Sequence, residues 1–227
     1  MCHLCNTKPV YEFTNQRKLC RNCFIHWFEK KFLYINRKFG MIKRGDILVI
    51  KGEGYKKAVL GHLLEKFKDK LMIKIIASPP NCSVSPTLKK NVKSKTAVID
   101  TIDTGAYNII NILINNKTAK LTELSPRIKK NKIIKPLYLF LDEEVLLYAK
   151  LKGLTPKLTP RGVPSSNKKK DTLYPKGYEK GTSKGEESLS EEGKEKKNKI
   201  SEFINELEKK HPEVKRAIVN GYLKIEN

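Results

Sequence analysis

The sequence contains no long apolar run and few acidic residues. No stretch of its 227 residues reaches the roughly 20 consecutive apolar side chains that a membrane-spanning helix needs, so we expect neither a membrane span nor a membrane partner. The 24 aspartates and glutamates face 47 lysines and arginines, which gives a net charge of +23 and an isoelectric point near 9.8. This excess of positive charge predicts a nucleic-acid partner; general solubility in a lysine-rich proteome is the alternative.

The positive charge lies mainly outside the C-terminal third of the chain. Residues 165–199 hold ten lysines and seven acidic residues, and residues 200–227 hold five of each sign, so +20 of the total +23 falls in residues 1–164. A folded body holds its charges at fixed spacing against a polyanion and releases counterions when it binds. We therefore expect the folded part of the chain to bind nucleic acid.

Cysteine is scarce beyond the first 23 residues, which contain four of the five cysteines. These four form two pairs, Cys2-x-x-Cys5 and Cys20-x-x-Cys23. Two such knuckles supply four thiolates at about 2.3 Å from a tetrahedral Zn²⁺ ion, so we predict a structural zinc site. A pair of disulfides is the alternative, and it suits a secreted chain, whereas we expect no secretory signal and a cytoplasmic protein.

Strand-like and helix-like segments alternate through the middle of the chain. Strands are expected at 47–50, 71–76, 96–99 and 137–139, and helices at 24–39, 55–67, 103–115 and 142–152. The last of these helices is expected to end at Gly153, a favoured residue after a helix C-terminus. Alternation of this kind predicts an α/β fold with a doubly wound, mostly parallel sheet.

Composition divides the chain into four parts. Residues 1–39 form the zinc knuckle with a basic, aromatic helix, and residues 40–153 form the α/β domain. Residues 154–199 are rich in Lys, Glu, Ser and Gly, and they have too few large apolar side chains to offset the entropy of ordering, so we expect a disordered linker. Residues 200–227 read as a helical hairpin that docks on the core.

The helix expected at 24–39 carries both aromatic and basic side chains. Trp27 and the phenylalanines at helical spacing are expected to pack the knuckle onto the main domain. The cations of this helix are the predicted RNA contacts, namely Lys30, Lys31, Arg37 and Lys38.

Several sequence blocks occur in the order found in one enzyme family. They are Cys2-x-x-Cys5 with Lys8-Pro9-Val10, Leu19-Cys20-x-x-Cys23-Phe24, Ile133-Ile134-Lys135-Pro136-Leu137-Tyr138, Tyr148-Ala149-x-Leu151-Lys152-Gly153, and Phe203-Ile204-Asn205-Glu206-Leu207-Glu208-x-x-His211-Pro212. Through these blocks the chain resembles the tRNA 2-thiolation ATP-pyrophosphatases, or PP-loop thiouridylases, as a degenerate and shortened member. The resemblance implies a PP-loop α/β domain that binds tRNA, adenylates the C2 carbonyl oxygen of a uridine and lets sulfur displace the adenylate.

The phosphate-binding loop of that family is altered here. The family carries Ser-Gly-Gly-x-Asp-Ser after its first strand, where this chain has Gly52-Glu53-Gly54-Tyr55-Lys56-Lys57. Only Gly54 matches in type, and Lys56 and Lys57 stand where the resemblance implies an aspartate and a serine. We do not expect ATP at this loop; the alternative is that Gly54, Lys56 and Lys57 bind phosphate in another way, with the lysines as point charges.

The sulfur site of the family is also reduced. The resemblance implies a Cys-x-x-Cys pair, often with a further cysteine that completes an iron–sulfur cluster, but here Cys82 is followed by Ser85 and by no later cysteine. One thiolate cannot hold a cluster, so we expect none. Cys82 is either a catalytic thiolate or a small buried apolar group. Asp103 is the acidic residue that remains near the expected catalytic position, and the short segment after Ile76 suggests a lost strand–helix unit.

Two functions from different classes follow. The first is a zinc-containing protein that binds tRNA or another RNA, is catalytically degenerate, and acts beside an intact thiolase paralogue or as a homodimer. The second is an active ATP-dependent tRNA uridine 2-sulfurtransferase with a rebuilt nucleotide loop that uses Lys56, Lys57, Asp103 and Cys82. A third possibility is a subunit that binds only protein, for which the basic body would be incidental.

Overall fold

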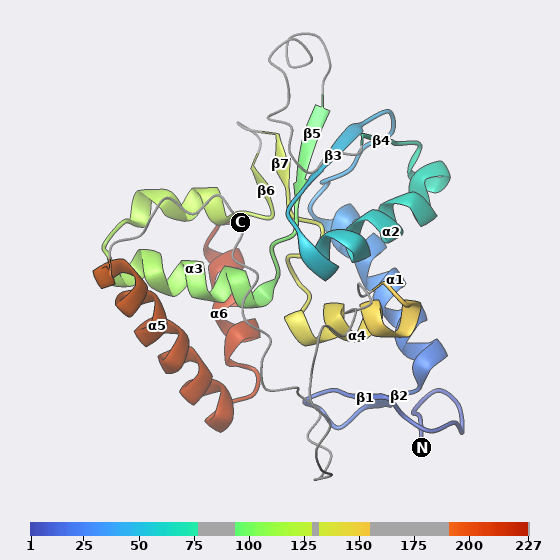
Figure 1. Cartoon of the computed structure of the whole chain (residues 1–227), viewed down its shortest axis with the longest axis horizontal. Coiled ribbons are helices and arrows are strands. Elements are labelled where there is room, and N and C mark those ends of the chain that lie inside the picture. Colours follow the sequence, from blue (N-terminus) through green and yellow to red (C-terminus); the bar gives the residue numbers. More distant parts are fainter. Residues whose placement is uncertain (77–93, 129–131, 155–190, 227) are drawn as a thin grey trace, which may run out of the picture.

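A five-stranded, mostly parallel sheet lies at the centre of the molecule (Figure 1). The computed structural model describes residues 1–76, 94–128, 132–154 and 191–226. The sheet order is β4-β3-β5-β7-β6. Its strands are β3 (Ile47–Lys51), β4 (Lys74–Ile76), β5 (Ser94–Val98), β6 (Arg127–Ile128) and β7 (Ile133–Ile134), of which only β6 runs antiparallel to its neighbour.

Helices cover both faces of this sheet (Figure 1). One group comprises α1 (Arg21–Lys38), α2 (Gly54–Leu71) and α4 (Asp142–Lys152). The other comprises α3 (Ile102–Ile114), the 3-10 helix η2 (Thr118–Leu124), α5 (Glu191–Lys210) and α6 (Val214–Glu226). The predicted doubly wound α/β fold is therefore confirmed.

Two apolar cores hold the layers together. In the larger one, α2 buries Val59, Leu60, Leu63 and Leu64 against the sheet, a spacing that places all four on one side of a helix. Aromatic rings join α1 to α4 in the same core, since the ring of Phe28 lies 4.3 Å from that of Tyr148. The second core lies between α3 and α6 and buries Val219, Tyr222 and Leu223.

The N-terminal segment forms a separate small ribbon on α1. Its strands β1 (Tyr11–Glu12) and β2 (Lys18–Leu19) pair antiparallel, and Leu19 is fully buried in the larger core. The ribbon is thereby tied to the α/β domain. None of the described helices is both long and apolar enough to cross a membrane.

Most helix boundaries lie within three residues of the predicted ones, but α2 runs to Leu71, so the strand predicted at 71–76 begins only at Lys74. A second predicted strand is wrong. Residues 137–139 lie in turns, and the strand that pairs with β5 is β7, a few residues earlier. Pro136 precedes this region and has no N–H to give to a sheet. Leu137 and Tyr138 are fully buried because they fill the two cores, which made the apolar run look like a strand.

The C-terminal hairpin begins earlier than expected. Helix α5 starts at Glu191, within the segment 154–199 that was expected to be disordered, and α6 packs on α3 rather than directly on the sheet. The rest of that segment, 155–190, lies outside the described residues, so disorder there stays a prediction.

Candidate functional site

The four N-terminal cysteines meet at one point. The β1–β2 ribbon returns the chain so that Cys2 and Cys5 face Cys20, which precedes the first residue of α1, and Cys23, which lies in its first turn. All four Sγ atoms lie within 4.8 Å of one another, and Cys5 Sγ is 3.4 Å from Cys20 Sγ and 3.7 Å from Cys23 Sγ. The predicted metal-binding site is present, and its four thiols are free of disulfides.

The spacing of the sulfur atoms in this cluster suits a metal held by thiolates. Bonds of about 2.3 Å from one tetrahedral ion place sulfurs about 3.8 Å apart, close to the spacing seen here. A hydrogen bond from the Thr7 hydroxyl, followed by one from the backbone of Cys23, lowers the pKa of Cys20 to about 6. A lowered pKa favours the thiolate, the form that binds metal. In contrast, the hydrogen bond with Cys20, and then burial, raise the pKa of Cys23 to about 12.

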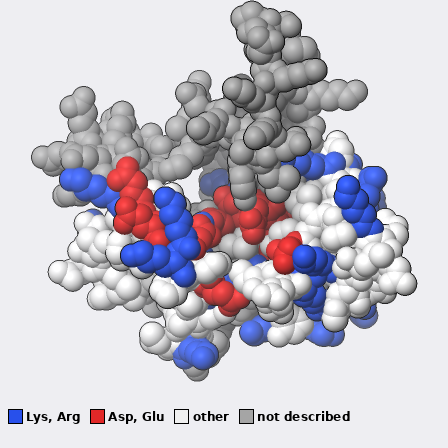
Figure 2. All heavy atoms as spheres, turned by 90° about the horizontal axis from the view of Figure 1, so that it is seen from below, with Lys and Arg blue, Asp and Glu red and all other residues white. Residues whose placement is uncertain are grey.

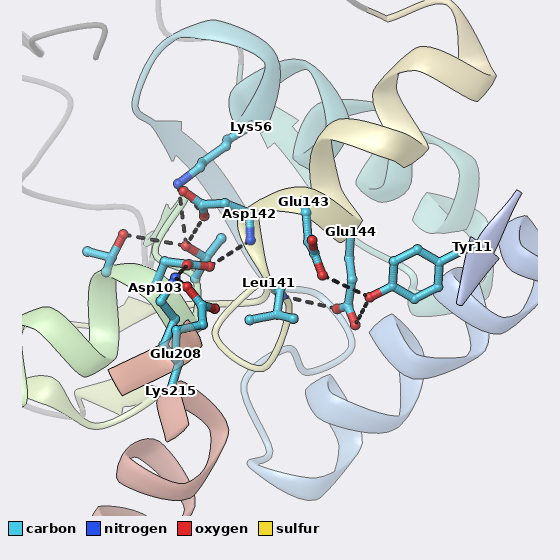
Figure 3. A network of polar contacts seen from close by, with 11 residues as sticks. Tyr11, Lys56, Asp103, Leu141, Asp142, Glu143, Glu144, Glu208 and Lys215 are labelled. Carbon is cyan, nitrogen blue, oxygen red and sulfur yellow. Dashed lines mark hydrogen bonds and ion pairs between the residues drawn. The ribbon is translucent and has the colours of Figure 1, made fainter. Parts of the chain in front are cut away.

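A second polar cluster lies at the carboxyl edge of the sheet (Figure 3). Strands β3 and β5 are parallel neighbours there, β3 leading into α2 and β5 into α3 on the other side of the sheet, the kind of switch point where α/β proteins bind ligands. Lys56 of α2 reaches across this point to Asp142 at the start of α4, with Nζ 2.7 Å from Oδ1. The hydroxyl of Thr101 contacts both side chains.

Asp103 has a structural position at this edge. Its Oδ2 accepts a hydrogen bond of 2.7 Å from the backbone N–H of Asp142, and its Oδ1 accepts one of 2.8 Å from Lys215 of α6. Lys215 also pairs with Glu208 of α5 at 2.7 Å. Asp103 thus caps α4 and holds the C-terminal hairpin, so both of its oxygens are occupied by the protein itself.

Glu144 is the most deeply buried charge of the network. Its side chain is fully buried, and its carboxylate pairs with Lys31 of α1 at 3.0 Å and with Arg216 of α6 at 2.7 Å. The backbone N–H of Leu141 and the hydroxyl of Tyr11 also donate to it. Burial and this neighbouring carboxylate raise the pKa of Tyr11. Glu144 thereby joins the ribbon, α1, α4 and α6 at one point.

Lys31 does not have the position expected of an RNA contact. Its side chain is only 17% exposed, pairs with Glu144, and lies 4.7 Å above the centre of the Trp27 ring. Burial lowers the pKa of Lys31, and Glu144 opposes that shift. The prediction treated all four cations of this helix alike, whereas the buried face of α1 takes Lys31 and leaves Lys30, Arg37 and Lys38 exposed.

The remaining predicted residues are distributed as follows. Gly54 begins α2 with φ of +70°, a conformation that glycine adopts readily, and Lys56 is paired as described above. Lys57 is half-buried and makes no ion pair with a described residue. Cys82 lies outside the described residues. The structure therefore brings Lys56 and Asp103 to one edge of the sheet, each already engaged by protein groups.

Sequence reasoning missed the acidic side of this network. Glu144, Lys215 and Arg216 are not among the predicted site residues, although Glu143-Glu144-Val145 is part of the family resemblance and the run of three acidic residues at the start of α4 is a signal for helix N-terminal charge. Figure 2 shows acidic side chains gathered toward the middle of one face, with lysines and arginines around them. The cations that meet these acids are thereby neutralised.

Comparisons with known proteins identify the fold. No protein-family model matches the sequence, and a search of curated proteins finds no match. Among solved structures, the chain is similar to a U34-tRNA thiolase, NcsA from Methanococcus maripaludis, solved with its [4Fe-4S] cluster. The TM-score is 0.63 at 17% sequence identity, and the match covers 99% of this chain and 86% of the thiolase.

This comparison corrects one expectation. We expected no iron–sulfur cluster because Cys82 has no second cysteine near it; that expectation is wrong, because the thiolase of the same fold carries such a cluster and this chain brings four cysteines together elsewhere. Four thiolates are the number that a [4Fe–4S] cluster takes. The chain thus has the reduced α/β fold of a tRNA thiolase, with a four-cysteine metal-binding site at its N-terminal end.

Proposed function

We propose that this chain is a cytoplasmic, metal-containing protein that binds tRNA or another RNA and no longer carries out the thiolation reaction. The observation that carries the proposal is the division of its cations into two sets. At the carboxyl edge of the sheet, Lys56 pairs with Asp142 and Lys215 pairs with Asp103, although the half-buried Lys57 makes no ion pair with a described residue. The cations on the outer face of α1, Lys30, Arg37 and Lys38, are exposed and make no ion pair with a described residue.

Unpaired cations are the ones that an RNA can use. Phosphate contacts gain free energy by releasing counterions, and a lysine already paired with a carboxylate has little charge to offer. The three exposed cations belong to one helix, which α4 and the ribbon fix in place. Their spacing is therefore set before RNA arrives.

Loss of catalysis is supported by the contents of the carboxyl edge. Lys56 and Asp103 are both held by protein groups, and Lys215 of α6 lies among them (Figure 3). Because these side chains are engaged by protein groups, the edge favours a non-catalytic role over an enzyme. Such a protein would be a partner or RNA-binding subunit that accompanies an intact thiolase or pairs with a second copy of itself.

The occupant of the four-cysteine site has two candidates. The Sγ spacing is that of a tetrahedron around a single ion, which supports Zn²⁺. The thiolase of the same fold carries a [4Fe-4S] cluster, and four thiolates also suit that group. Metal analysis of the purified protein separates them, because a single zinc ion per chain supports the first, and iron with acid-labile sulfide and visible colour supports the second.

RNA binding is tested with a triple variant, Lys30→Ala with Arg37→Ala and Lys38→Ala. Measured by anisotropy of a labelled tRNA, its affinity should fall by at least tenfold, since each phosphate contact adds to binding. The matched control replaces Arg44, Lys70 and Lys74, which are exposed, lie outside α1 and make no ion pair with a described residue, and it should change affinity little. Equal losses in both triple variants would count against a site on α1.

An active ATP-dependent tRNA uridine 2-sulfurtransferase is the second candidate. Its support is the strand–glycine–helix arrangement of β3, Gly54 and α2 at the switch point, with Lys56 beside it. Calorimetric titration with ATP separates the candidates. Stoichiometric ATP binding at micromolar affinity, lost in Lys56→Ala, would contradict the proposal of a non-catalytic protein.

A further inference from the structure

An open groove of about 410 Å³ lies beside the cysteine cluster on the outer face of α1. Aromatic and cationic side chains line it, and the lining residues include Leu4, Arg17, His26, Trp27, Lys30 and Tyr34. Its volume falls near the lower end of the range of sites for small organic groups, about 300–1,000 Å³. The groove is distinct from the carboxyl edge of the sheet, where the acidic network lies.

The aromatic side chains of the groove have different roles. Trp27 is packed from within, because Phe13 meets its ring at 4.8 Å and the Lys31 ammonium lies 4.7 Å above it. Tyr34 is 51% exposed and makes no hydrogen bond or ring contact with any described residue. Trp27 therefore forms a fixed wall, and Tyr34 offers a free ring face.

The charged side chains of the groove are cationic apart from Cys23, a ligand of the metal-binding site that also lines it. Arg17 and Lys30 make no ion pair with a described carboxylate, and no acidic residue is among the lining residues. Lys31 also lines the groove, but its charge is met from beneath by Glu144. An occupant that places a flat apolar group against Tyr34 and negative charge beside Arg17 and Lys30 would complement this surface.

We propose that this groove binds an unpaired nucleotide of an RNA strand, with its base against Tyr34 and its flanking phosphates at Lys30 and Arg17. The inference rests on the proposed RNA-binding function and names the form of RNA that its α1 surface takes. Bases within a duplex are stacked and cannot reach a side-chain ring, whereas bases of a loop or single strand can. Stacking of this kind tolerates any base, because every base has an aromatic face.

The composition of the sequence makes the test direct. Trp27 is the only tryptophan of the chain, so its fluorescence reports on this groove alone. The full-length protein is titrated with a labelled ten-nucleotide oligouridylate, with the same length of RNA duplex, and with polyphosphate as a charge-only probe. We expect the single strand to quench Trp27 emission over the concentration range in which its anisotropy rises. Duplex and polyphosphate should bind, if at all, with little quenching.

Substitution of the free ring tests its role. Tyr34→Ala should weaken oligouridylate binding about tenfold, the size expected for losing one stacked base. Tyr34→Phe keeps the ring and should bind as the wild type does. Lys30→Ala should also weaken binding, whereas Lys70→Ala, which removes an exposed lysine of α2, should not. Because Tyr34 and both lysines are exposed, these variants are expected to fold.

The outcomes distinguish this inference from the function on which it rests. Absence of RNA binding at low salt would overturn both. RNA binding that leaves Trp27 emission unchanged and is insensitive to Tyr34→Ala would be consistent with the proposed RNA-binding function. It would overturn the proposal that the nucleotide binds in this groove. Equal quenching by polyphosphate would identify a general site for polyanions, and it would also overturn the proposal.

Discussion

At the scale of single residues, Glu144 shows how this chain handles buried charge. Its carboxylate is fully buried, yet it meets two cations and a backbone donor within hydrogen-bond distance. Taking a carboxylate out of water costs several kcal/mol, and only close partners offset that cost. The three segments that supply those partners come from the middle and the end of the chain as well as from α1, so the residue has a structural role.

Replacing this carboxylate should be strongly destabilising. In Glu144→Gln the side chain keeps its shape, but Lys31 and Arg216 lose the negative charge that balances them. We expect the free energy of unfolding, measured by urea denaturation, to fall by about 3–5 kcal/mol. Glu143→Gln changes the neighbouring, more exposed carboxylate and should cost less than about 1 kcal/mol. Similar losses in the two variants would contradict the assigned role of Glu144.

His62 predicts a pH dependence of stability. Burial, and then the charges of Lys152 and Lys66, lower the pKa of His62 from its ordinary value of 6.5, while Glu29 opposes the shift. The unfolded chain therefore takes up a proton at a higher pH than the folded chain, so stability falls as the pH drops through 6.5 toward the lowered pKa.

The measurement compares urea unfolding at pH 7.5 and pH 5.5 in the wild type and in His62→Gln. The variant should lose less stability between the two pH values than the wild type does, because it lacks the titrating group. His211→Gln, at an exposed position between α5 and α6, serves as the control and should follow the wild type. A larger loss in His62→Gln would show that the direction of the shift is wrong.

At the scale of elements, the ends of helices are set by local backbone chemistry. Helix α4 ends at Gly153, which has φ of +67° and no atom near the position where a Cβ would stand. Any loss of stability on replacing Gly153 with alanine would therefore come from strain in the backbone conformation and not from a side-chain clash. Gly221 of α6 also has open space around it, but its φ is not positive. The two glycines form a matched pair with opposite expected effects.

Alanine substitution at these positions should change stability in opposite directions. Gly153→Ala should lower the free energy of unfolding by about 1 kcal/mol, since a residue with a Cβ is strained in this conformation. Gly221→Ala should raise it by about 0.5–1 kcal/mol, because alanine is the better helix former. Thermal or urea unfolding measures both. A stabilising Gly153→Ala would contradict the assigned left-handed end of α4.

The cysteine knuckle is the element most dependent on metal. Leu19 and Cys20 are buried with the larger core, so loss of the metal should loosen residues 1–23 and the first turn of α1. Hydrogen exchange with and without a strong chelator should show lost protection there, while β3 and α2 keep theirs. The Cys20→Ser variant should behave as the chelated protein does. Uniform loss of protection throughout the chain would contradict this local dependence.

The sequence predicted elements well where the signal was local. The Asp142–Lys152 helix, its end at Gly153 and the Cys2–Cys23 cluster all follow from spacing and end residues. Strand β7 has two residues, and the apolar side chains just after it serve packing between helices, so periodicity alone misplaced the strand. The pairing of Lys31 with Glu144 could not be predicted, because the two residues lie more than a hundred positions apart in sequence.

At the scale of the whole molecule, the protein has a large positive net charge, but two of its surfaces differ in whether their cations are paired with carboxylates. The carboxyl edge of the sheet carries an acidic network (Figure 3) matched by lysines and Arg216, whereas the outer face of α1 carries unmatched cations. The exposed, unpaired cations make α1 the proposed RNA-binding surface.

RNA affinity as a function of salt tests the central claim most directly. For the wild type, we predict that affinity for tRNA falls by about 10³ or more between about 50 and 200 mM salt, as expected when at least six phosphates are neutralised. The triple variant of Lys30, Arg37 and Lys38 should show a shallower slope, by about one unit for each lost contact. An affinity that ignores salt, or a slope that the triple variant leaves unchanged, would contradict the claim that this chain binds RNA through the exposed cations of α1.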